Sequence, residues 1–357
     1  MKRKVIFSLD AGGTNLVFSA IEEGNPIPET HTIPTGSKSL EEFIHKLVQG
    51  FSGLQEKLNV QPAAISFCFP GPADYAAGII GKLENLPFFT GGTPLAKMLE
   101  HHFLVPVFIN NDGDLFALGE ALGGLLPEIN KYSEKQYGNL LGVTLGTGFG
   151  GGIVHKGVLF SGDNSAGGEI NRSFNYLNPN QSVEEVLSIR GIQRLYAELA
   201  QLDFAKAPEP KEIYELGMQK GKKGDVAREA WRQFGVVLGE MLANAVTLTD
   251  SCVVIGGGLS GAHPLFLPAA VERMNGSFVK ADGNLLARME MHAFNWEDEK
   301  CRKDFLKDDS VQLQVPNSNL TQVYYPKKKV AVGISKLGTS KAVAVGAYAY
   351  AAKQLGF

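Results

Sequence analysis

Apolar residues alternate along this chain between short continuous runs and longer segments with helical spacing. Residues 5–21 contain two apolar runs separated by a Gly-Gly-Thr turn, a pattern that predicts a β-hairpin. Residues 39–58 place apolar side chains three and four positions apart, which predicts an amphipathic helix with Ser39 and Glu42 as a capping box. Three further elements are expected in this half: strands at 63–69 and 105–111, and a short helix at 94–103. Strands that alternate with helices indicate an α/β lobe with a largely parallel sheet.

The same order of elements begins again in the second half of the chain. Residues 139–160 predict a strand, a Gly-Thr turn and a second strand. Helices at 182–200 and 225–248 and a strand at 251–258 are expected to follow. The chain is therefore predicted to be internally duplicated, with two lobes whose Gly-Thr turns would face each other across a central cleft.

Two later segments complete the expected organisation. Residues 282–325 are charged and show no clear period, so we interpret them as an insertion. A final helix at 341–355 is rich in small residues and is expected to pack tightly against the first lobe. The expected lobes are residues 1–112 together with 341–357, and residues 113–340. A chain of 357 residues exceeds what one core usually supports, which agrees with two lobes.

Composition and charge exclude several classes of protein. Hydrophobic residues are 44% and charged residues 20% of the chain, as in ordinary globular proteins. A net charge of -3 provides no field that would attract nucleic acid or a membrane surface. The first apolar run ends at Asp10, too early for a signal peptide, so a cytoplasmic protein is expected. Cys68, Cys252 and Cys301 are odd in number and far apart, which favours reduced structural thiols.

The glycine-rich turns suit the binding of phosphate groups. Backbone N–H groups in such turns approach a phosphate closely because no Cβ obstructs them, and a Thr hydroxyl adds a donor. One alternative is a dinucleotide site, because residues 146–151 formally match G-x-G-x-x-G. That fingerprint must open a helix, whereas residues 152–160 are rich in β-forming residues. The remaining alternative is that the glycines serve only tight hairpins.

Several motifs occur in an order and spacing that resemble the ROK family of sugar kinases, named for repressors, open reading frames and kinases. The motifs are DAGGTN (10–15), PGPAD (70–74), ENLP (84–87), NNDGDLFALGE (110–120), GTGFGGGI (146–153), GGEI (167–170) and VIGGG (254–258). The closing helix also resembles the end of that family. The resemblance implies the actin-like, ribonuclease-H-like ATPase fold, with ATP and a hexose in the cleft and phosphoryl transfer from MgATP to a sugar hydroxyl.

The resemblance also implies roles for individual residues. Asp112 would be the general base, with the alternative that it only N-caps the helix that follows, and Asp114 would be structural. Asp10 would orient Mg²⁺, through water, because Mg²⁺ gives up its waters reluctantly. The residues expected to contact ATP are Gly12, Gly13, Thr14, Gly146, Thr147, Gly148, Gly256, Gly257 and Gly258.

Sugar recognition would use a further group of polar and glycine positions. By the resemblance these are Gly71, Asn85, Asn111, Glu169, Arg172 and Glu184. Arg172 stands where the family has His, and the family's zinc-binding cysteines are absent from the residues after it, so no structural zinc is predicted. Arg172 would either replace the His as a sugar contact or pair with an acid. Glu184 aligns only if SVEE replaces the family's Cys-Leu-Glu, and its alternative role is that of an acid in a first helical turn.

The predicted function is an ATP-dependent kinase acting on a hexose or an N-acylhexosamine. Glucose, fructose, mannose, allose and N-acylated hexosamines all suit a pocket of Asn, Glu and Gly. A repressor of this family would carry a helix-turn-helix before the first strand, and that strand is expected at about residue 5. A non-catalytic sugar sensor is the alternative, although it would be expected to lose Asp112 or the phosphate glycines. The family habit predicts a homodimer.

Overall fold

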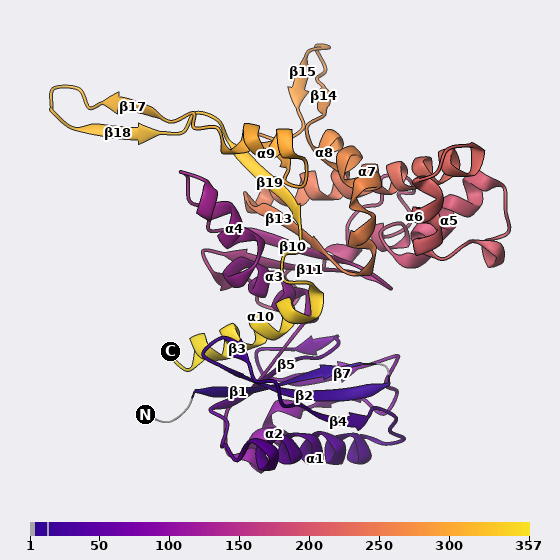
Figure 1. Cartoon of the computed structure of the whole chain (residues 1–357), viewed down its shortest axis with the longest axis vertical. Helices are drawn as coiled ribbons and strands as arrows, with labels where there is room; N and C mark the ends of the chain where they lie inside the picture. Colours follow the sequence, from indigo (N-terminus) through magenta and orange to yellow (C-terminus); the bar gives the residue numbers. More distant parts are fainter. Residues whose placement is uncertain (1–3, 13) are drawn as a thin grey trace. The chain divides into compact units, whose positions relative to one another are not determined.

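The chain groups into two compact units, which we describe separately. The computed structural model describes residues 4–12 and 14–357 (Figure 1). Unit 1 consists of Met1–Gly124, Gly152–Gly168 and Leu337–Phe357, and unit 2 of Leu125–Gly151 and Glu169–Lys336. The main difference from the expected lobes is that residues 113–124 and 152–168, expected in the second lobe, belong to unit 1. The expected lobes stay a prediction.

Unit 1 is built on a mixed sheet with the strand order β3-β2-β1-β5-β9, in which β4 also pairs with β2. Its strands are β1 (Val5–Ala11), β2 (Asn15–Glu22), β3 (Asn25–Pro26), β4 (His31–Pro34), β5 (Ala64–Cys68) and β9 (Val107–Asn110). β1 and β2 are antiparallel, which confirms the predicted hairpin. β5 and β9 run parallel to β1, so their carboxyl ends lie at the same edge as the end of β1.

Helices cover both faces of this sheet. α1 (Leu40–Leu58) and α2 (Leu95–Phe103) pack on the face that carries Phe7, while Ile6 packs with residues of the C-terminal helix α10 (Thr339–Gln354) on the other face (Figure 1). This division follows from the alternation of side chains along a strand. The capping box of α1 is only half formed. Ser39 Oγ accepts the N–H of Glu42, but the Glu42 carboxylate accepts the N–H of Lys38 at 2.8 Å.

Unit 1 also contains a small sheet of order β6-β7-β8 and the helix α3. Their bounds are β6 (Ala73–Asp74), β7 (Ile79–Lys82), β8 (Thr90–Thr93) and α3 (Asp112–Gly123). α3 packs against α10 with almost no space between the backbones, because a Cβ on Gly119 would lie 1.9 Å from the Ala342 carbonyl oxygen. A Cβ on Gly346 would lie 2.0 Å from the Leu115 oxygen. The tight packing expected of the last helix is confirmed, on α3 as well as on the sheet.

The second sheet has the order β12-β11-β10-β13-β19-β16. Its strands are β10 (Leu140–Leu145), β11 (Phe149–His155), β12 (Val158–Leu159), β13 (Cys252–Gly256), β16 (His292–Asn295) and β19 (Lys329–Ile334). A hairpin at one side is followed by the parallel strands β10, β13, β19 and β16. This arrangement repeats that of unit 1, as the internal duplication predicts.

Helices and short 3-10 turns complete unit 2. The helices are α4 (Leu125–Tyr132), α5 (Ile189–Ala200), α6 (Pro210–Gly217), α7 (Lys222–Thr249), α8 (His263–Met274) and α9 (Glu299–Leu306), and the turns are η1 (Ile170–Arg172), η2 (Val183–Glu185), η3 (Phe204–Lys206) and η4 (Gly258–Ala262). The helix predicted to begin at residue 182 begins at Ile189, because Ser188 caps it by accepting the N–H of Gly191 at 3.3 Å. No helix within the described residues is long and apolar enough to cross a membrane.

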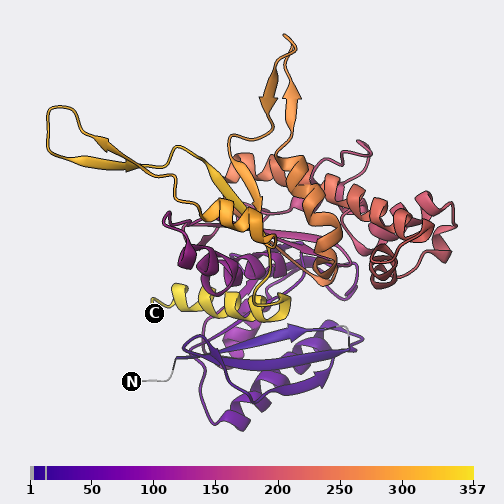
Figure 2. The ribbon, with the colours of Figure 1, turned by 45° about the horizontal axis from the view of Figure 1, so that its top comes forward.

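The expected insertion at 282–325 is partly integrated into the unit. β16 pairs with β19 in the main sheet, and its four residues are too few for a periodic signal in the sequence. Two hairpins in or next to this segment instead project from the rest of unit 2, as Figures 1 and 2 show. They are formed by β14 (Ser277–Val279) with β15 (Leu285–Ala287), and by β17 (Val311–Gln314) with β18 (Thr321–Tyr324).

Candidate functional site

The carboxyl ends of the parallel strands in unit 1 bring together polar residues predicted from the sequence. Cys68 pairs with Asn110 where β5 and β9 end. Ile6 pairs with Ala64, and the same register continued along β1 places Asp10 level with Cys68. Burial, and to a smaller extent the charges of Asp112 and Asp10, together raise the pKa of the Cys68 thiol to about 12. Both carboxylates therefore lie near this thiol, at one edge of the sheet.

Asp112 is the first residue of α3 and is exposed. The N-cap is Asn111, whose side-chain oxygen accepts the Gly113 N–H at 2.8 Å, so the capping role weighed for Asp112 belongs to its neighbour. Asp112 Oδ1 accepts the same N–H at 2.9 Å, while its Oδ2 accepts no hydrogen bond from the described residues. An exposed carboxylate oxygen is thus held at a fixed place and remains available to accept a proton.

Asn110 and Asn111 have different surroundings although they are adjacent. Asn110 is 2% exposed, and its Nδ2 has no hydrogen-bond partner within the described residues. Such an unpaired group costs about 1–3 kcal/mol. Asn111 Nδ2 lies 3.5 Å from the hydroxyl of Tyr75, at the long limit for a hydrogen bond. The amide of Asn111 is thereby directed toward the loop that follows β5.

Tyr75 organises this loop and was not identified from the sequence. Its side chain is buried, and its hydroxyl donates to the Phe69 carbonyl oxygen at 3.0 Å. Its backbone N–H donates to Ser165 Oγ at 3.2 Å. A Cβ on Gly71 would lie 3.0 Å from the Tyr75 hydroxyl, so the glycine of PGPAD gives this ring its space. Asn85 is exposed in the loop between β7 and β8.

The turn after β1 carries the other predicted residues of unit 1. Gly12 N–H donates to the Asn15 carbonyl at 2.9 Å and closes the turn. Thr14 is exposed, and its carbonyl accepts the N–H of Thr35 at 3.0 Å. Gly13 lies outside the described residues. The Asp10 carboxylate, also exposed, makes no hydrogen bond or ion pair with the described residues.

In unit 2 the Gly146–Gly148 turn joins β10 to β11. Gly146 N–H donates to the Gly148 carbonyl at 3.0 Å, and the Gly146 carbonyl accepts the N–H of Ile189 at 2.8 Å. A Cβ on Gly146 would meet nothing within 4 Å, and Thr147 is exposed. The turn is therefore anchored to the start of α5 and leaves open space at its backbone.

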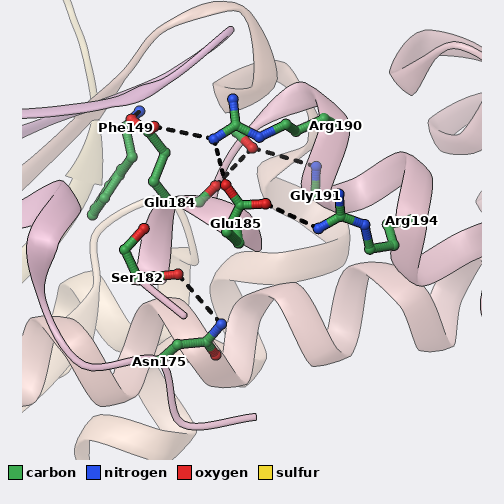
Figure 3. A network of polar contacts seen from close by, with 9 residues as sticks. Phe149, Asn175, Ser182, Glu184, Glu185, Arg190, Gly191 and Arg194 are labelled. Carbon is green, nitrogen blue, oxygen red and sulfur yellow. Dashed lines mark hydrogen bonds and ion pairs between the residues drawn. The ribbon is translucent and has the colours of Figure 1, made fainter. Parts of the chain in front are cut away.

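Glu184 lies directly against this turn (Figure 3). Its Oε2 accepts the Phe149 N–H at 3.0 Å, and its Oε1 accepts from Arg190 at 3.2 Å. A Cβ on Gly148 would lie 2.8 Å from Oε2, so glycine is the residue that fits beside this carboxylate. The structure thus gives Glu184, in the 3-10 turn η2, a contact with the glycine turn that the sequence analysis did not anticipate.

Neighbouring charges hold Arg190 in place. Arg190 donates a hydrogen bond to the Glu185 carboxylate at 2.8 Å, and Arg194 donates a second one to the same carboxylate at 3.0 Å (Figure 3). Hydrogen bonds from Arg194 and Arg190 lower the pKa of the Glu185 carboxyl, and the bond to Glu185 raises the pKa of Arg190. These groups are part-exposed, so each pair contributes modestly to stability. Their main effect is to restrict the position of the Glu184 carboxylate.

Residues 169–182 form the loop that precedes Glu184, and the side-chain amide of Asn175 holds this loop closed. Asn175 is fully buried, its Oδ1 accepts from Leu177 N–H at 3.0 Å and Asn178 N–H at 3.3 Å, and its Nδ2 donates to the Ser182 carbonyl at 3.4 Å (Figure 3). Sequence analysis missed Asn175, although its N-x-x-N-P-N context is typical of turns stabilised by Asn side chains. A hydrogen-bonded amide closes the loop.

Glu169 and Arg172 lie at the two ends of this loop's first turn, and both are exposed. Arg172 N–H donates to the Glu169 carbonyl at 3.3 Å. Within the part of the chain that the structure describes, no acid pairs with the Arg172 guanidinium. Its five donors are therefore available to a ligand.

The loop is expected to need no zinc. No cluster of three or more His, Cys, Asp or Glu residues suited to a metal occurs within residues 4–12 and 14–357. We predict that elemental analysis of protein purified without chelator finds no stoichiometric zinc, and that chelator leaves the melting temperature unchanged. One zinc per chain, lost with a fall in melting temperature, would contradict this prediction.

The glycines after β13 have two different environments. Gly257 has a positive φ of +86°, and a Cβ there would lie 2.2 Å from the Leu145 carbonyl oxygen. Glycine is required at this position by both conformation and space. A Cβ on Gly258 would meet nothing within 4 Å, so its backbone is open to a ligand. Gly256 ends β13 and is buried.

Comparison with known proteins identifies the family. The model of the ROK family matches residues 6–291. The N-acetyl-D-glucosamine kinase of Vibrio atlanticus is 30% identical over 281 residues, which are 73% of this chain and 86% of that protein. The crystal structure of a glucokinase from Parabacteroides distasonis is 45% identical with a TM-score of 0.90, covering 99% of this chain and 98% of that one.

A more distant structure confirms the fold. The ROK family glucokinase from Streptomyces griseus, solved in complex with glucose and AMPPNP, has a TM-score of 0.62 at 20% identity, over 98% of this chain and 99% of that one. At that identity the likeness concerns the fold alone. The expected actin-like, ribonuclease-H-like fold is confirmed by these structural relatives. On the match over residues 6–291, this chain belongs to the ROK family.

Proposed function

We propose that this protein is an ATP-dependent sugar kinase that transfers the γ-phosphoryl group of MgATP to a hydroxyl of a hexose or an N-acylhexosamine. The observation that carries the proposal is the pair of carboxylates, Asp10 and Asp112, near Cys68 at the carboxyl edge of the unit 1 sheet. Relatives named N-acetyl-D-glucosamine kinase and glucokinase support a sugar as the phosphate acceptor.

Asp112 serves as the general base. As the sugar oxygen forms its bond to the γ-phosphorus, the bond from that phosphorus to the β–γ bridging oxygen breaks and ADP leaves. The proton of the sugar hydroxyl passes to the Asp112 carboxylate, whose Oδ2 is free of hydrogen bonds from the described residues. A positioned base of this kind contributes about 10²–10⁴ in rate.

The residues present suit MgATP as the phosphate donor. Asp10 offers a carboxylate with no partner among the described residues, and oxygen ligands are what Mg²⁺ prefers. The open backbone at Gly146 suits a phosphate, and that at Gly258 suits adenosine. The other residues proposed to contact ATP are Gly12, Gly13, Thr14, Thr147, Gly148, Gly256 and Gly257. When bound, Mg²⁺ would be oriented by Asp10 through water and would neutralise charge on the phosphates, and the backbone N–H groups would orient the phosphates.

The sugar is held by several polar groups at once, because each hydroxyl left unpaired in a buried site costs binding energy. Gly71, Asn85, Asn111, Glu169 and Arg172 carry this role in the proposal. Asn111 is oriented by Tyr75, and Arg172 supplies donors in place of the family His. Glu184 was expected in the same group, but both of its carboxylate oxygens already accept hydrogen bonds from the chain, so we propose that it supports the glycine turn instead.

Glu184→Gln distinguishes sugar binding from support of the glycine turn. The substitution removes the negative charge that Phe149 N–H and Arg190 share. Hydrogen bonds to charged groups are worth about 1.5–3 kcal/mol, so we expect KM for ATP to rise about tenfold or more with little change in KM for sugar. Steady-state kinetics with each substrate varied would measure both constants.

Glu185→Gln is the matched control, because Glu185 bonds Arg190 and Arg194 without touching the glycine turn. We expect it to change KM for ATP by less than about threefold, because an exposed ion pair contributes little free energy. A rise in KM for sugar alone in the Glu184 variant would instead make Glu184 a sugar ligand.

ADP release by the purified protein, measured with MgATP against a panel of hexoses and N-acylhexosamines, tests the proposed function. We expect one sugar to turn over at about 1–100 s⁻¹. Binding of a sugar without turnover would favour a non-catalytic sensor. If no sugar binds, the substrate class is wrong. A homodimer, expected from the family habit, also belongs to this proposal.

A further inference from the structure

The hairpin β17–β18 leaves an edge that lacks the usual protection against pairing. Every residue of both strands is exposed, and Val311, Leu313, Val323 and Tyr324 are between 45% and 51% exposed. Residues 310–326 contain no charged side chain. A two-stranded hairpin alone is at best marginally stable in water, and natural edge strands usually carry charges that prevent pairing. The absence of charge therefore suggests that this edge is covered.

The register of the hairpin shows which backbone groups face outward. Val315 N–H donates to the Leu320 carbonyl at 2.9 Å, and β17 pairs Val311 with Tyr324 and Leu313 with Gln322. Hydrogen-bonded pairs alternate with non-bonded pairs along an antiparallel ladder. The residues between these pairs, Gln312 and Gln314, therefore direct their N–H and C=O groups to the free edge of β17.

The sequence of β17 and the next residue is a palindrome. Residues 311–315 read Val-Gln-Leu-Gln-Val, so an antiparallel copy of the same strand matches it residue for residue. With a two-fold axis at Leu313, the outward groups of Gln312 meet those of Gln314 of the partner subunit. Val311 lies opposite Val315 of the partner subunit, and no like charges oppose each other. A pairing of this kind is isologous and closed, as in most dimers.

We propose that β17 pairs in an antiparallel manner with β17 of a second copy of this chain, about a two-fold axis at Leu313. The pairing joins the hairpins into a four-stranded sheet and satisfies the outward groups of Gln312 and Gln314. The other projecting hairpin fits this role less well, because charged Lys280, Asp282 and Arg288 lie in or beside its strands.

The hairpin lies outside the region that the ROK family model matches. The ROK family match ends at residue 291, before β17 begins. The Parabacteroides distasonis glucokinase, however, aligns over 99% of this chain at 45% identity. The proposed interface does not depend on kinase activity, so its failure would leave the proposed sugar kinase activity standing.

The oligomeric mass tests the interface. Light scattering on a sizing column at micromolar concentration should give twice the 38.4 kDa of one chain. Gln312→Pro removes an outward N–H of β17 without removing a hydrogen bond inside the hairpin, and should halve the mass. Val323→Pro is the matched control, because Val323 faces Gln312 across the hairpin and directs its N–H to the opposite edge. It should remain dimeric.

Four results would overturn the proposal: a monomeric wild-type protein, a Gln312→Pro variant that stays dimeric, dissociation of both variants alike, or dissociation of the control alone. ADP release by Gln312→Pro should stay within about twofold of wild type, since surface changes away from a site have small effects. This assay shows that the variant is folded. If the Gln312→Pro variant is monomeric but shows no cooperative thermal unfolding, it is not folded, and the cross-linking experiment then tests the interface.

Disulfide cross-linking tests the register. In the proposed ladder Leu313 and its counterpart form a non-hydrogen-bonded pair, with Cα atoms about 4.5 Å apart, which is within the range for a disulfide. Leu313→Cys should therefore give a covalent dimer on mild oxidation. Gln322→Cys, on the same face of β18, and the wild-type protein with its own three cysteines should remain single chains on a non-reducing denaturing gel. Equal cross-linking of both variants, or of neither, would contradict the register.

Discussion

Asp112→Asn is expected to lower the rate of sugar phosphorylation by at least about 10²-fold while sugar binding is retained. The amide keeps the shape of the side chain and its oxygen can still accept the Gly113 N–H at the start of α3. It cannot accept the proton of the sugar hydroxyl at neutral pH. The loss should therefore appear in kcat rather than in the dissociation constant of the sugar.

A coupled ADP assay would give kcat, and calorimetric titration would give the sugar dissociation constant. Asp282→Asn, a change of an exposed carboxylate near the tip of the β14–β15 hairpin, is the control and should leave both values within about twofold. If kcat decreased by less than about tenfold, Asp112 would not be the general base. Loss of sugar binding together with activity would instead indicate that Asp112 is mainly a binding residue.

Gly119→Ala is expected to produce the largest loss of stability, because the new Cβ would lie 1.9 Å from the Ala342 carbonyl oxygen. Backbone atoms of α10 cannot move aside as the end of a flexible side chain can, so α3 and α10 must separate. Overpacking typically costs about 1–3 kcal/mol and occasionally more. Because α3 begins at Asp112, the separation should also lower the rate of phosphorylation.

Gly123→Ala is the matched control, one turn further along the same helix. Its Cβ would meet Val345 at 3.6 Å and Leu337 at 3.7 Å, which is ordinary contact. Alanine is favoured over glycine in helices by about 1 kcal/mol, so this variant should be unchanged or slightly more stable. Chemical denaturation would measure both free energies of unfolding. Equal effects of the two substitutions would show that helix propensity, rather than the contact with α10, governs this position.

The sequence alone predicted the elements whose signal is local and repeated. The hairpin at 5–21 and the helix at 39–58 appear at the predicted places, because their apolar spacing extends over many residues. The start of α5 was predicted seven residues too early, at 182 instead of 189, since a 3-10 turn with apolar residues precedes it. β16 has only four residues and became recognisable as a strand only through its pairing with β19.

The residues of the candidate site also fall into those whose position was predictable from the sequence and those whose contacts were not. Asp10 lies near the end of β1, and Asn111 and Asp112 follow β9, so their place at a sheet edge was predictable from the apolar runs before them. Their nearness to one another depends on the parallel pairing of β1, β5 and β9, which the alternation of strands and helices indicated. Residue types and spacing predicted these positions, whereas the roles of the residues were implied by the resemblance to the ROK family.

Other contacts of the site join residues that no local pattern connects. Glu184 accepts a hydrogen bond from the Phe149 N–H across 35 positions, and the Tyr75 N–H donates to Ser165 Oγ across 90. Asn175 closes its loop through the hydrogen bonds of its amide and is fully buried, a location that its polar character would not suggest. Periodicity and turn chemistry, acting over a few neighbouring residues, determined the elements, and the resemblance to the family's motifs identified the candidate carboxylates. Only the tertiary structure decided which polar groups became partners, because that depends on packing between segments distant in the chain.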